Sequence, residues 1–482
     1  MNRQQALSIS CGLCGMLTAV PAVAQKVSNT GKQRPNIVFI LADDLGIGDI
    51  QPYGQRIIRT PNLERMAHDG LTFTQAYAGT AVSAPSRASL LTGFHTGHTF
   101  IRGNLRHDPE GQVAMPEGTY TLAQMLHDAG YATGCFGKWG LGYPGSTSDP
   151  TRVGFDNFFG YNCQTLAHDY YPDHLWDNLK RVDLPMNANQ QENVYSADTI
   201  HARALQFIRQ HAHEPFFAFL SYTLPHAELR LPEDSVFSYY ASIIPDSCEK
   251  PFAEANPNRR GAYGSQRRPL AAFAAMVTRL DRYVGDVMRV LKEEGIADNT
   301  LVIFTSDNGP HREGGANPDY FDSYAQYRGV KRDLYEGGIR MPMLAVWPHH
   351  ISAGTTSDRL VAFWDMMPTF ASLAGAKCNK HTDGLSFSSL LDGGKPSKAH
   401  DHLYWEFHEQ GGKQAVRWGK WKLVKLQVSH PERTVTELYD LTTDIHEDHN
   451  VAAEHPDVVK HMEKIIGKEH RDSELFDFRK GK

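Results

Sequence analysis

Acidic and amide side chains follow two apolar stretches that lie far apart in the sequence. Asp43 and Asp44 end the stretch "NIVFILADD", and Asp307 and Asn308 end "NTLVIFTSDN". These three carboxylates and one amide form an all-oxygen set, which suits Ca²⁺ because it takes about six to eight oxygen ligands in irregular geometry. Zinc would call for more histidine or cysteine. Each motif alone is also typical of a turn, but two of them at the ends of apolar strands favour a metal site.

Basic side chains accompany these acids in other motifs. They are Arg87, Lys138 and Lys331, with Arg340 and His226 as further candidates. A metal ion together with several cations suits a substrate that carries a tetrahedral oxyanion, because negative charge moves onto its oxygens and leaving group in the transition state. A single lysine or arginine is more often a solvated surface group. Lys138 is the exception, since it closes an apolar stretch and is flanked by glycines and a tryptophan in "FGKWG".

The stretch "VSAPSRASLLTG", residues 82–93, predicts the start of a helix. Ser83 or Ala84 can cap it, Pro85 suits the first turn, and Arg87 follows about one turn later. Ser83 would then lie where backbone N–H groups and the helix dipole favour negative charge. Most helix starts of this kind have no catalytic role, so this stretch gains meaning only from the other motifs.

Apolar strands alternate with helical segments over most of the chain. Strands are predicted at residues 37–41 and within "YATGCFGKWG", "PFFAFLSYTLPH", "NTLVIFTSDNG" and "MPMLAVWP", and helices at 60–70, 121–130, 196–211 and 270–294. This alternation predicts an α/β fold with a large, mostly parallel sheet flanked by helices. Sites in such sheets lie beyond the carboxyl ends of the strands, which is where the acids, Lys138 and His226 fall.

The pattern changes after about residue 395. The stretches "HLYWEF", "QAVRWGKWKLVKL" and "TELYDL" predict short antiparallel strands, followed by a helix over residues 455–468. We therefore expect a catalytic α/β domain over 35–395 and a smaller C-terminal α+β subdomain over 396–482. Residues 229–268 lack periodicity and predict a long surface excursion near the mouth of the site.

The first 24 residues resemble an export signal, with Arg3, an apolar stretch and Ala-Val-Ala before Gln25. Residues 25–34 are expected to be a linker, and the protein to be periplasmic, with secreted and lipid-anchored forms as alternatives and no integral membrane segment in the mature chain. The net charge of −6, without basic blocks, excludes nucleic acid as a partner. The cysteines outside the signal form no CxxC pair and are expected to be buried thiols: Cys135, Cys163, Cys248 and Cys378.

The stretch "SAPSRASLLTG" resembles the signature of the sulfatase family, Cys/Ser-x-Pro-x-Arg followed by Leu-Thr-Gly. Five further stretches resemble motifs of that family in the same order: "NIVFILADDLG", "FGKWGLG", "TSDNG", "GVKRDLYEGGIRMP" and "ELYDLTTDIHEDHNV". The likeness extends over nearly the whole chain after the signal. It implies an alkaline-phosphatase-like fold and an enzyme of the serine type, related to bacterial sulfatases that act on glycans.

The resemblance also implies a role for each motif. Ser83 would be oxidised by a maturation enzyme to formylglycine (3-oxoalanine), whose hydrate is the nucleophile, and Arg87 would orient that hydrate. Lys138 and Lys331 would hold the sulfate oxygens, and His226 would protonate the leaving alcohol. The implied ligands of Ca²⁺ are Asp43, Asp44, Asp307, Asn308 and the modified Ser83.

One position departs from the family pattern. Many relatives have histidine two residues after the lysine, where this chain has Gly140. That histidine is usually assigned to sulfate release, so another group must take over its task. A metal-bound aspartate, His98 and His311 are the candidates, and the sequence leaves the choice open.

Polar and aromatic residues alternate in "QTLAHDYYPDHLW", residues 164–176. Such a mixture suits a sugar, whose face stacks on rings and whose hydroxyls need hydrogen-bond partners. An aromatic surface loop without a binding role is the alternative. The expected substrate-binding residues are His168, His174, His311 and, in the small subdomain, Gln414.

These features predict an exported carbohydrate sulfatase that acts on a sulfated oligosaccharide or glycan, at a galactose-type or N-acetylhexosamine sugar. Two alternatives stay open. A phosphomonoester or phosphodiester hydrolase could share the fold, and the chain could be a catalytically inactive glycan-binding protein if Ser83 is not modified.

Overall fold

The computed structural model describes residues 34–254, 263–378, 381–394 and 398–480. The predicted export signal, nearly all of the predicted linker and the predicted boundary between residues 395 and 396 lie outside the described residues. No helix in the described ranges is both long and apolar enough to cross a membrane. Cys135 and Cys163 are buried thiols as expected, whereas Cys248 and Cys378 are thiols that are partly exposed.

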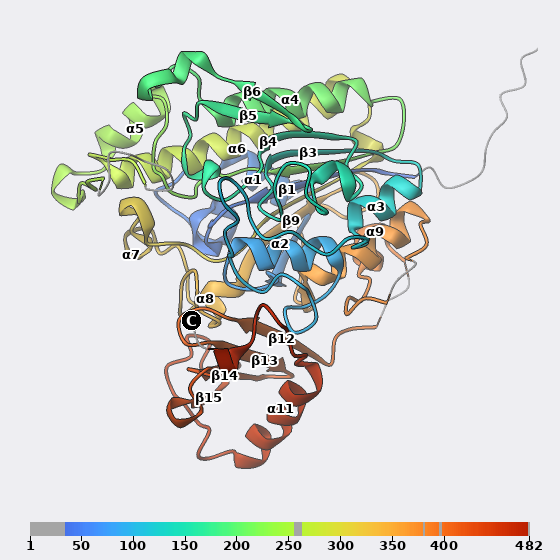
Figure 1. Ribbon diagram of the computed structural model, residues 1–482, viewed down its shortest axis with the longest axis vertical. Helices are drawn as coiled ribbons and strands as arrows, with labels where there is room; N and C mark the ends of the chain where they lie inside the picture. The colour runs from blue at the N-terminus through green and yellow to red at the C-terminus, as the bar shows by residue number, and fades with distance from the viewer. Residues whose placement is uncertain (1–33, 255–262, 379–380, 395–397, 481–482) are drawn as a thin grey trace, which may run out of the picture. The chain divides into compact units, whose positions relative to one another are not determined.

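A large mixed sheet forms the centre of the structure (Figure 1). Its strands run in the order β10-β2-β9-β8-β1-β7-β3-β4-β5-β6, with β11 paired to β2. The five central strands β8, β1, β7, β3 and β4 are parallel, and antiparallel pairs occur toward both edges. The strands are β1 (Asn36–Ala42), β2 (Leu71–Tyr77), β3 (Ala132–Lys138), β4 (Asn157–Tyr161), β5 (His174–Asp177), β6 (Lys180–Asp183), β7 (Phe216–Ser221), β8 (Thr300–Ser306), β9 (Arg340–Val346), β10 (Thr355–Ser357) and β11 (Val361–Ala362).

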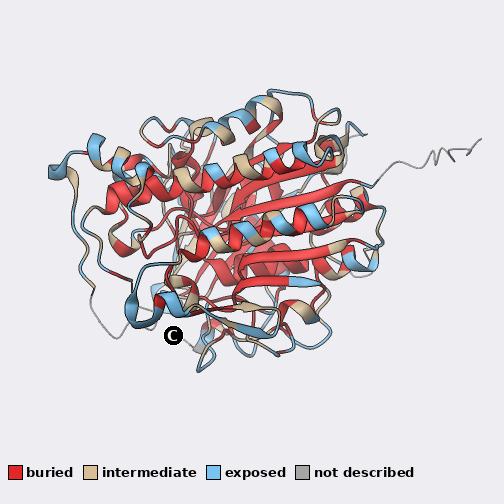
Figure 2. Ribbon diagram, turned by 90° about the horizontal axis from the view of Figure 1, so that it is seen from above, coloured by how far each residue is buried: buried red, intermediate tan, exposed pale blue. Residues whose placement is uncertain are grey.

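Helices cover both faces of this sheet, so the central strands are buried along nearly their whole length (Figure 2). On one face, Val38 and Ile40 of β1 belong to a core cluster with α1 (Pro61–Asp69), α4 (Ser196–Gln210), α5 (Ser235–Ile243) and α6 (Pro269–Glu293). On the other, Ile37, Phe39 and Leu41 belong to a cluster with α2 (Ser83–Thr92), α3 (Leu122–Asp128), α9 (Met366–Ala374) and α10 (Ser388–Asp392). Successive side chains of a strand point to opposite faces, which explains this division.

A second sheet follows near the end of the chain. Its antiparallel strands β12 (His402–Phe407), β13 (Lys413–Trp418), β14 (Trp421–Leu426) and β15 (Val435–Asp440) lie in sequence order. Helix α11 (Pro456–Glu469) packs on this sheet through Met462 and Ile466, which share a core cluster with Tyr404 and Val416. The predicted fold class, a mostly parallel sheet with helices and a smaller antiparallel sheet with one helix, is therefore confirmed.

The segment 229–268 is more regular than its sequence suggests. Within it, Asp234 caps α5 by accepting hydrogen bonds from the backbone N–H groups of Val236 and Phe237. Val236 and Tyr240 are buried and join the core cluster that contains α6. The helix is short, and six of its nine residues in SVFSYYASI are apolar or aromatic, so no helical period stands out in its sequence.

A buried ion cluster joins the small sheet to the large one. Lys422 of β14 is fully buried, and its Nζ lies 2.8 Å from Glu336 Oε1 and 3.5 Å from Glu447 Oε1. Glu336 begins the short helix α8 (Glu336–Ile339), and its other oxygen accepts a hydrogen bond from Tyr77 of β2. Burial would raise the pKa of Glu336, but the charges of Lys422 and Arg340 outweigh it and lower the pKa to about 2.

Replacing Lys422 should therefore destabilise the protein strongly. In the variant Lys422→Met, Glu336 loses a fully buried cation, and the loss of one partner of a buried ion pair costs about 3–5 kcal/mol of unfolding free energy. Denaturant unfolding measures this cost. Lys425→Met on the same strand is the matched control, because Lys425 pairs with Glu463 at the surface and such pairs contribute about 0–1 kcal/mol. Equal effects of the two substitutions would contradict the role of the buried cluster.

Candidate active site

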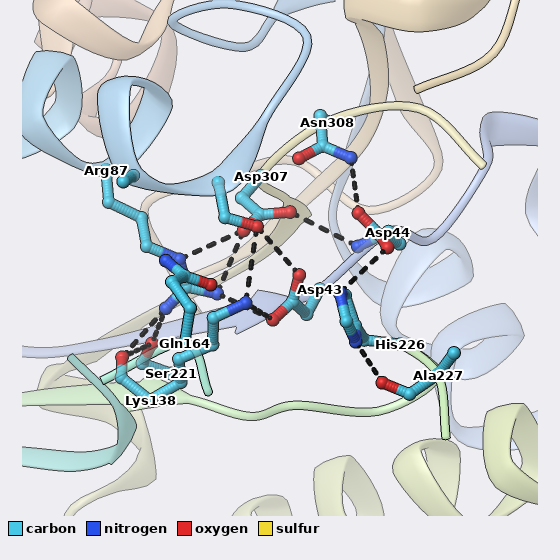
Figure 3. Close-up of polar contacts among 12 residues, drawn as sticks. Asp43, Asp44, Arg87, Lys138, Gln164, Ser221, His226, Ala227, Asp307 and Asn308 are labelled. Carbon is cyan, nitrogen blue, oxygen red and sulfur yellow. Dashed lines mark hydrogen bonds and ion pairs between the residues drawn. The ribbon is translucent and has the colours of Figure 1, made fainter. Parts of the chain in front are cut away.

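The predicted site residues meet at the carboxyl ends of adjacent parallel strands (Figure 3). Strand β1 pairs with β7 on one side and with β8 on the other, and β3 pairs with β7. Lys138 ends β3, while the other residues follow directly or shortly after their strands: Asp43 and Asp44 after β1, His226 after β7, Asp307 and Asn308 after β8. The ends of these strands lie side by side, so residues distant in sequence share one buried pocket.

Ser83 lies at the first position of α2, one residue later than a cap. The N-cap is Val82, which makes no side-chain capping bond, so the predicted cap at Ser83 or Ala84 is wrong. The reason is that the Ser83 hydroxyl is used elsewhere: Oγ donates to Asp43 Oδ1 at 2.9 Å and accepts from Lys138 Nζ at 3.4 Å. All ten residues of α2 are buried, so this helix is an internal element that holds Ser83 against β1 and β3.

Arg87 follows one turn after Ser83 and is also buried. Its Nε and Nη2 lie 3.0 and 2.9 Å from Asp307 Oδ2, and its Nη1 donates to the carbonyl oxygen of Lys138 at 2.8 Å and to the Ser221 hydroxyl. The guanidinium thus joins α2 to the ends of β3, β7 and β8. This number of contacts fixes its orientation, which suits a group that must present a positive charge at a defined place.

The surroundings of Asp43 and Asp307 shift the pKa values of these two carboxyl groups in opposite directions. Burial would raise the pKa of Asp43, but Lys138 at 2.5 Å, His226 and Arg87 hold it below the usual range. Burial and the neighbouring Asp43 raise the pKa of Asp307 to about 6. The cations present therefore do not fully compensate the clustered carboxylates, and a divalent cation would do so.

The donors around these acids fit such a cation. Asn308 Nδ2 donates to Asp44 Oδ1 at 2.6 Å, whereas Asn308 Oδ1 is buried and has no hydrogen-bond partner among the described residues. The backbone N–H of Asp44 donates to Asp307 Oδ1 at 3.2 Å, which holds the Asp307 carboxylate against the backbone at the end of β1. An unpaired buried oxygen beside three carboxylates is what a hard cation with oxygen ligands would satisfy.

Lys331 and His226 lie together beside Asp44. Lys331 Nζ lies 2.8 Å from Asp44 Oδ2, 2.7 Å from Glu313 Oε2 and 3.2 Å from His226 Nε2. Burial would lower the pKa of Lys331, but Asp44 and Glu313 outweigh it and raise the pKa. Burial and the charge on Lys331 lower the pKa of His226. Since His226 Nδ1 donates to the carbonyl oxygen of Ala227, its Nε2 is the acceptor of the bond from Lys331.

Glu313 is a member of the site that the sequence analysis missed. It is largely buried, and the charge on Lys331 outweighs burial and lowers its pKa below the usual range. It follows Asp307 by six residues in "SDNGPHREGG". That closeness to a metal motif was the only signal in the sequence, because a glutamate in a glycine-rich loop is otherwise typical of a solvated turn.

The predicted substrate residues lie in different places. The His168 ring stacks on His226 with centroids 5.1 Å apart, and the His311 ring stacks on the same His226 at 5.8 Å. His174 pairs with Glu110 and Asp173 on the wall of a cavity of about 290 Å³.

Three other expected residues lie outside the pocket and have their own partners. Gln414 of β13 donates to Tyr404 Oη at 2.8 Å within the small sheet. His98 Nδ1 lies 2.9 Å from Asp383. Arg340 donates to the carbonyl oxygen of Thr74 and to Glu336.

Two family models match the sequence. The model described as Sulfatase matches residues 35–376, and the model described as N-sulphoglucosamine sulphohydrolase, C-terminal, matches residues 327–472. Together they extend from β1 into the residues after α11, so the matches include both sheets and every residue of the pocket.

Curated relatives and solved structures agree with these matches. Human N-acetylgalactosamine-6-sulfatase is 33% identical over 75% of this chain and 66% of its own length, so the aligned region spans about two thirds of that relative. An N-acetylgalactosamine-6-O-sulfatase of Bacteroides thetaiotaomicron is 28% identical over 94% of this chain and 96% of its own. The crystal structure of Ps i-CgsB in complex with k-i-k-neocarrahexaose is 30% identical, covers 90% of this chain and 93% of its own, and has a TM-score of 0.72. The chain therefore belongs to the sulfatase family, whose members hydrolyse sulfate esters.

Proposed function

We propose that the protein is an exported carbohydrate sulfatase that hydrolyses a sulfate ester on a galactose-type or N-acetylhexosamine sugar. One observation carries this proposal: the Ser83 hydroxyl is fixed between a carboxylate of Asp43 and the ammonium group of Lys138 in a buried, charged pocket. A serine placed so deeply has no evident structural duty, and its neighbours are the groups that an anionic substrate requires.

The substrate class rests on two kinds of support. Relatives with related sequences are named as N-acetylgalactosamine-6-sulfatases, and a similar structure contains an oligosaccharide. In this chain, the His168 ring stacks on His226 and lies 5.0 Å from the Tyr263 ring, so aromatic rings border the pocket. Polar side chains beside aromatic rings favour a sugar over a simple aryl group.

The nucleophile would be formylglycine made from Ser83 by a maturation enzyme. When formed, the hydrated aldehyde supplies an oxygen nucleophile that ionises more readily than a serine hydroxyl. Asp43 Oδ1, which accepts the present hydroxyl at 2.9 Å, would hold the proton of that oxygen. Lys138 and Arg87 would orient the sulfate by donating to its oxygens, which carry more negative charge in the transition state.

Ca²⁺ would be held by Asp43, Asp44, Asp307, Asn308 and the modified residue 83. Bound there, it would supply positive charge to the sulfate and to the nucleophile. The unpaired Asn308 Oδ1 and the raised pKa of Asp307 support this choice of residues, because both indicate a place where a cation is favourable.

The leaving alcohol would receive its proton through His226. Lys331 donates to His226 Nε2 and is itself protonated, since Asp44 and Glu313 raise its pKa. A negatively charged sulfate ester beside the ring would favour the imidazolium form that burial and Lys331 now disfavour. Lys331 would then donate to a sulfate oxygen, while His226 Nε2 would donate to the bridging oxygen.

The proposal also includes the glycan contacts, the domain bounds and the location of the protein. We propose that His174 and His311 contact the glycan, whereas Gln414 is 6% exposed and already donates to Tyr404 Oη. We also propose that the catalytic domain comprises residues 35–395 and the small subdomain 396–482. The separate core cluster between the small sheet and α11 supports that division. Export through the signal at residues 1–24 and a periplasmic location complete the proposal.

The reaction class can be tested with matched sugar esters. We expect matured protein to release sulfate from N-acetylgalactosamine 6-sulfate faster than phosphate from the 6-phosphate. The support for sulfate over phosphate comes from the family model and from the relatives named as sulfatases. Faster phosphate release would favour a phosphoester hydrolase, and glycan binding without release of either anion would favour a binding protein.

The role of His226 predicts a difference between two substrates. A sugar alcohol leaves poorly without a proton, whereas nitrophenolate needs none, so His226→Ala should lose about 10²–10⁴-fold in kcat/KM on the sulfated sugar and far less on nitrophenyl sulfate. Steady-state rates on both substrates measure the difference, and the melting temperature serves as the control for folding. Equal losses on the two substrates would mean that His226 has a structural role only.

A further inference from the structure

Gly140 lies two residues after Lys138, at a position where a side chain would have no room. Its φ of +76° is in the left-handed region that favours glycine, and a Cβ at this position would lie 2.5 Å from Gln164 Nε2. The backbone here is fixed, since the N–H groups of Trp139 and Gly140 donate to the carbonyl oxygens of Tyr161 and Asn162. The space that a side chain of residue 140 would need is therefore filled by the carboxamide of Gln164.

The carboxamide of Gln164 has an unused hydrogen-bond donor. The residue is 8% exposed, and its Nε2 is buried without a hydrogen-bond partner among the described residues. Its backbone N–H donates to Gln112 Oε1 at 2.8 Å, which holds the residue in place. Buried donors are rarely left unpaired, because the lost hydrogen bonds to water are not replaced. A ligand that accepts this bond would remove the cost.

The surroundings of Gln164 indicate an anionic ligand. In the view of Figure 3, Gln164 lies on the same side of the site as Arg87, Lys138 and Ser221 and away from His226. Gly140, whose Cβ position the Gln164 carboxamide occupies, comes two residues after Lys138. Lys138 Nζ lies 3.4 Å from Ser83 Oγ, and Arg87 Nη1 donates to the carbonyl oxygen of Lys138. Two cations thus lie close to the predicted nucleophile, and the unpaired N–H donor belongs to the loop that pairs with the residues directly after Lys138.

We propose that Gln164 Nε2 donates a hydrogen bond to an oxygen of the sulfate group and so serves as a catalytic residue in the place that a side chain of residue 140 would need. This inference rests on the proposed function. Gln164, in the loop after β4, would thus occupy the place of the family's histidine, which this chain replaces with Gly140. His98 pairs with Asp383 elsewhere, and the His311 ring stacks on His226, with Nε2 3.3 Å from the carbonyl oxygen of Pro225.

A carboxamide differs from a histidine in its chemistry. It does not titrate near neutral pH, so it donates the same hydrogen bond over the whole working range and transfers no proton. Gln164 therefore orients the sulfate and stabilises its developing charge, while proton transfer is left to the groups around His226 and Asp43. The reaction loses one titrating group relative to a site with histidine at position 140.

Three variants test this role through kcat/KM on the sulfated sugar. Gln164→Ala removes one donor to a developing oxyanion and should lower kcat/KM by about 10²–10³-fold. Gln164→Glu should be at least as poor at neutral pH, because its carboxylate repels sulfate. Its activity relative to wild type should recover as the pH falls through the pKa of the new carboxyl group, which then donates through its O–H. Gln124→Ala is the matched control, because the Gln124 side chain on α3 donates to Asp128 near the surface. Unchanged kcat/KM in Gln164→Ala, or a Gln164→Glu deficit that does not depend on pH, would overturn the proposal.

Binding of inorganic sulfate separates this proposal from the proposed function. In the Ser83→Ala background, which cannot turn over, calorimetry should show sulfate binding about tenfold weaker when Gln164→Ala is added. Gly140→Ala, which displaces the carboxamide, should weaken it in the same direction. Equal sulfate affinity with and without Gln164 would overturn the role of Gln164 even if the wild type is an active sulfatase. Dependence of sulfate binding on Gln164 in a protein that hydrolyses no sulfated sugar would instead refute the proposed function and the catalytic role of Gln164, and would uphold only its hydrogen bond to sulfate.

Discussion

The pocket depends on keeping the carboxylate of Asp43 charged inside the protein. Moving an ionised carboxylate out of water costs several kcal/mol, and only close, well-placed cations repay that cost. Here Lys138 at 2.5 Å and Arg87 at 3.4 Å provide them. Because Lys138 belongs to β3 and Arg87 to α2, the compensation of one charge on β1 also fixes the positions of two other elements. The contacts that stabilise the charge of Asp43 are therefore the same contacts that set the geometry of the catalytic groups.

The burial of α2 and the position of Ser83 follow from the need to compensate the charge of Asp43. Helix α2 has to be buried over its whole length, since Arg87 must reach Asp43 and Asp307 from within the core. The start of α2 then lies against β1, and Ser83 meets Asp43 directly. A serine hydroxyl at a helix N-terminus, beside a lysine, is a place where a developing negative charge is stabilised without any movement of the protein.

Local sequence patterns predicted the strands and the polar residues at their ends. Apolar strands end in polar residues at Asp43, Lys138 and Asp307, and parallel pairing then gathers those ends, so most of the pocket could be predicted without coordinates. Gln164 and Glu313 could not, because each lies in a loop whose path depends on packing between distant segments. The start of α2 was misplaced by one residue, since a buried partner for Ser83 outweighed the usual preference for serine as a cap.

The central claim is that Ser83 is the precursor of the nucleophile, and mass spectrometry of the Ser83 peptide tests it most directly. Protein made in its natural host should contain this peptide partly or fully oxidised, lighter by the hydrogen lost when an alcohol becomes an aldehyde. The rate of sulfate release should rise in proportion to the oxidised fraction across preparations. Full sulfatase activity in a preparation whose Ser83 peptide is entirely unmodified serine would contradict the account.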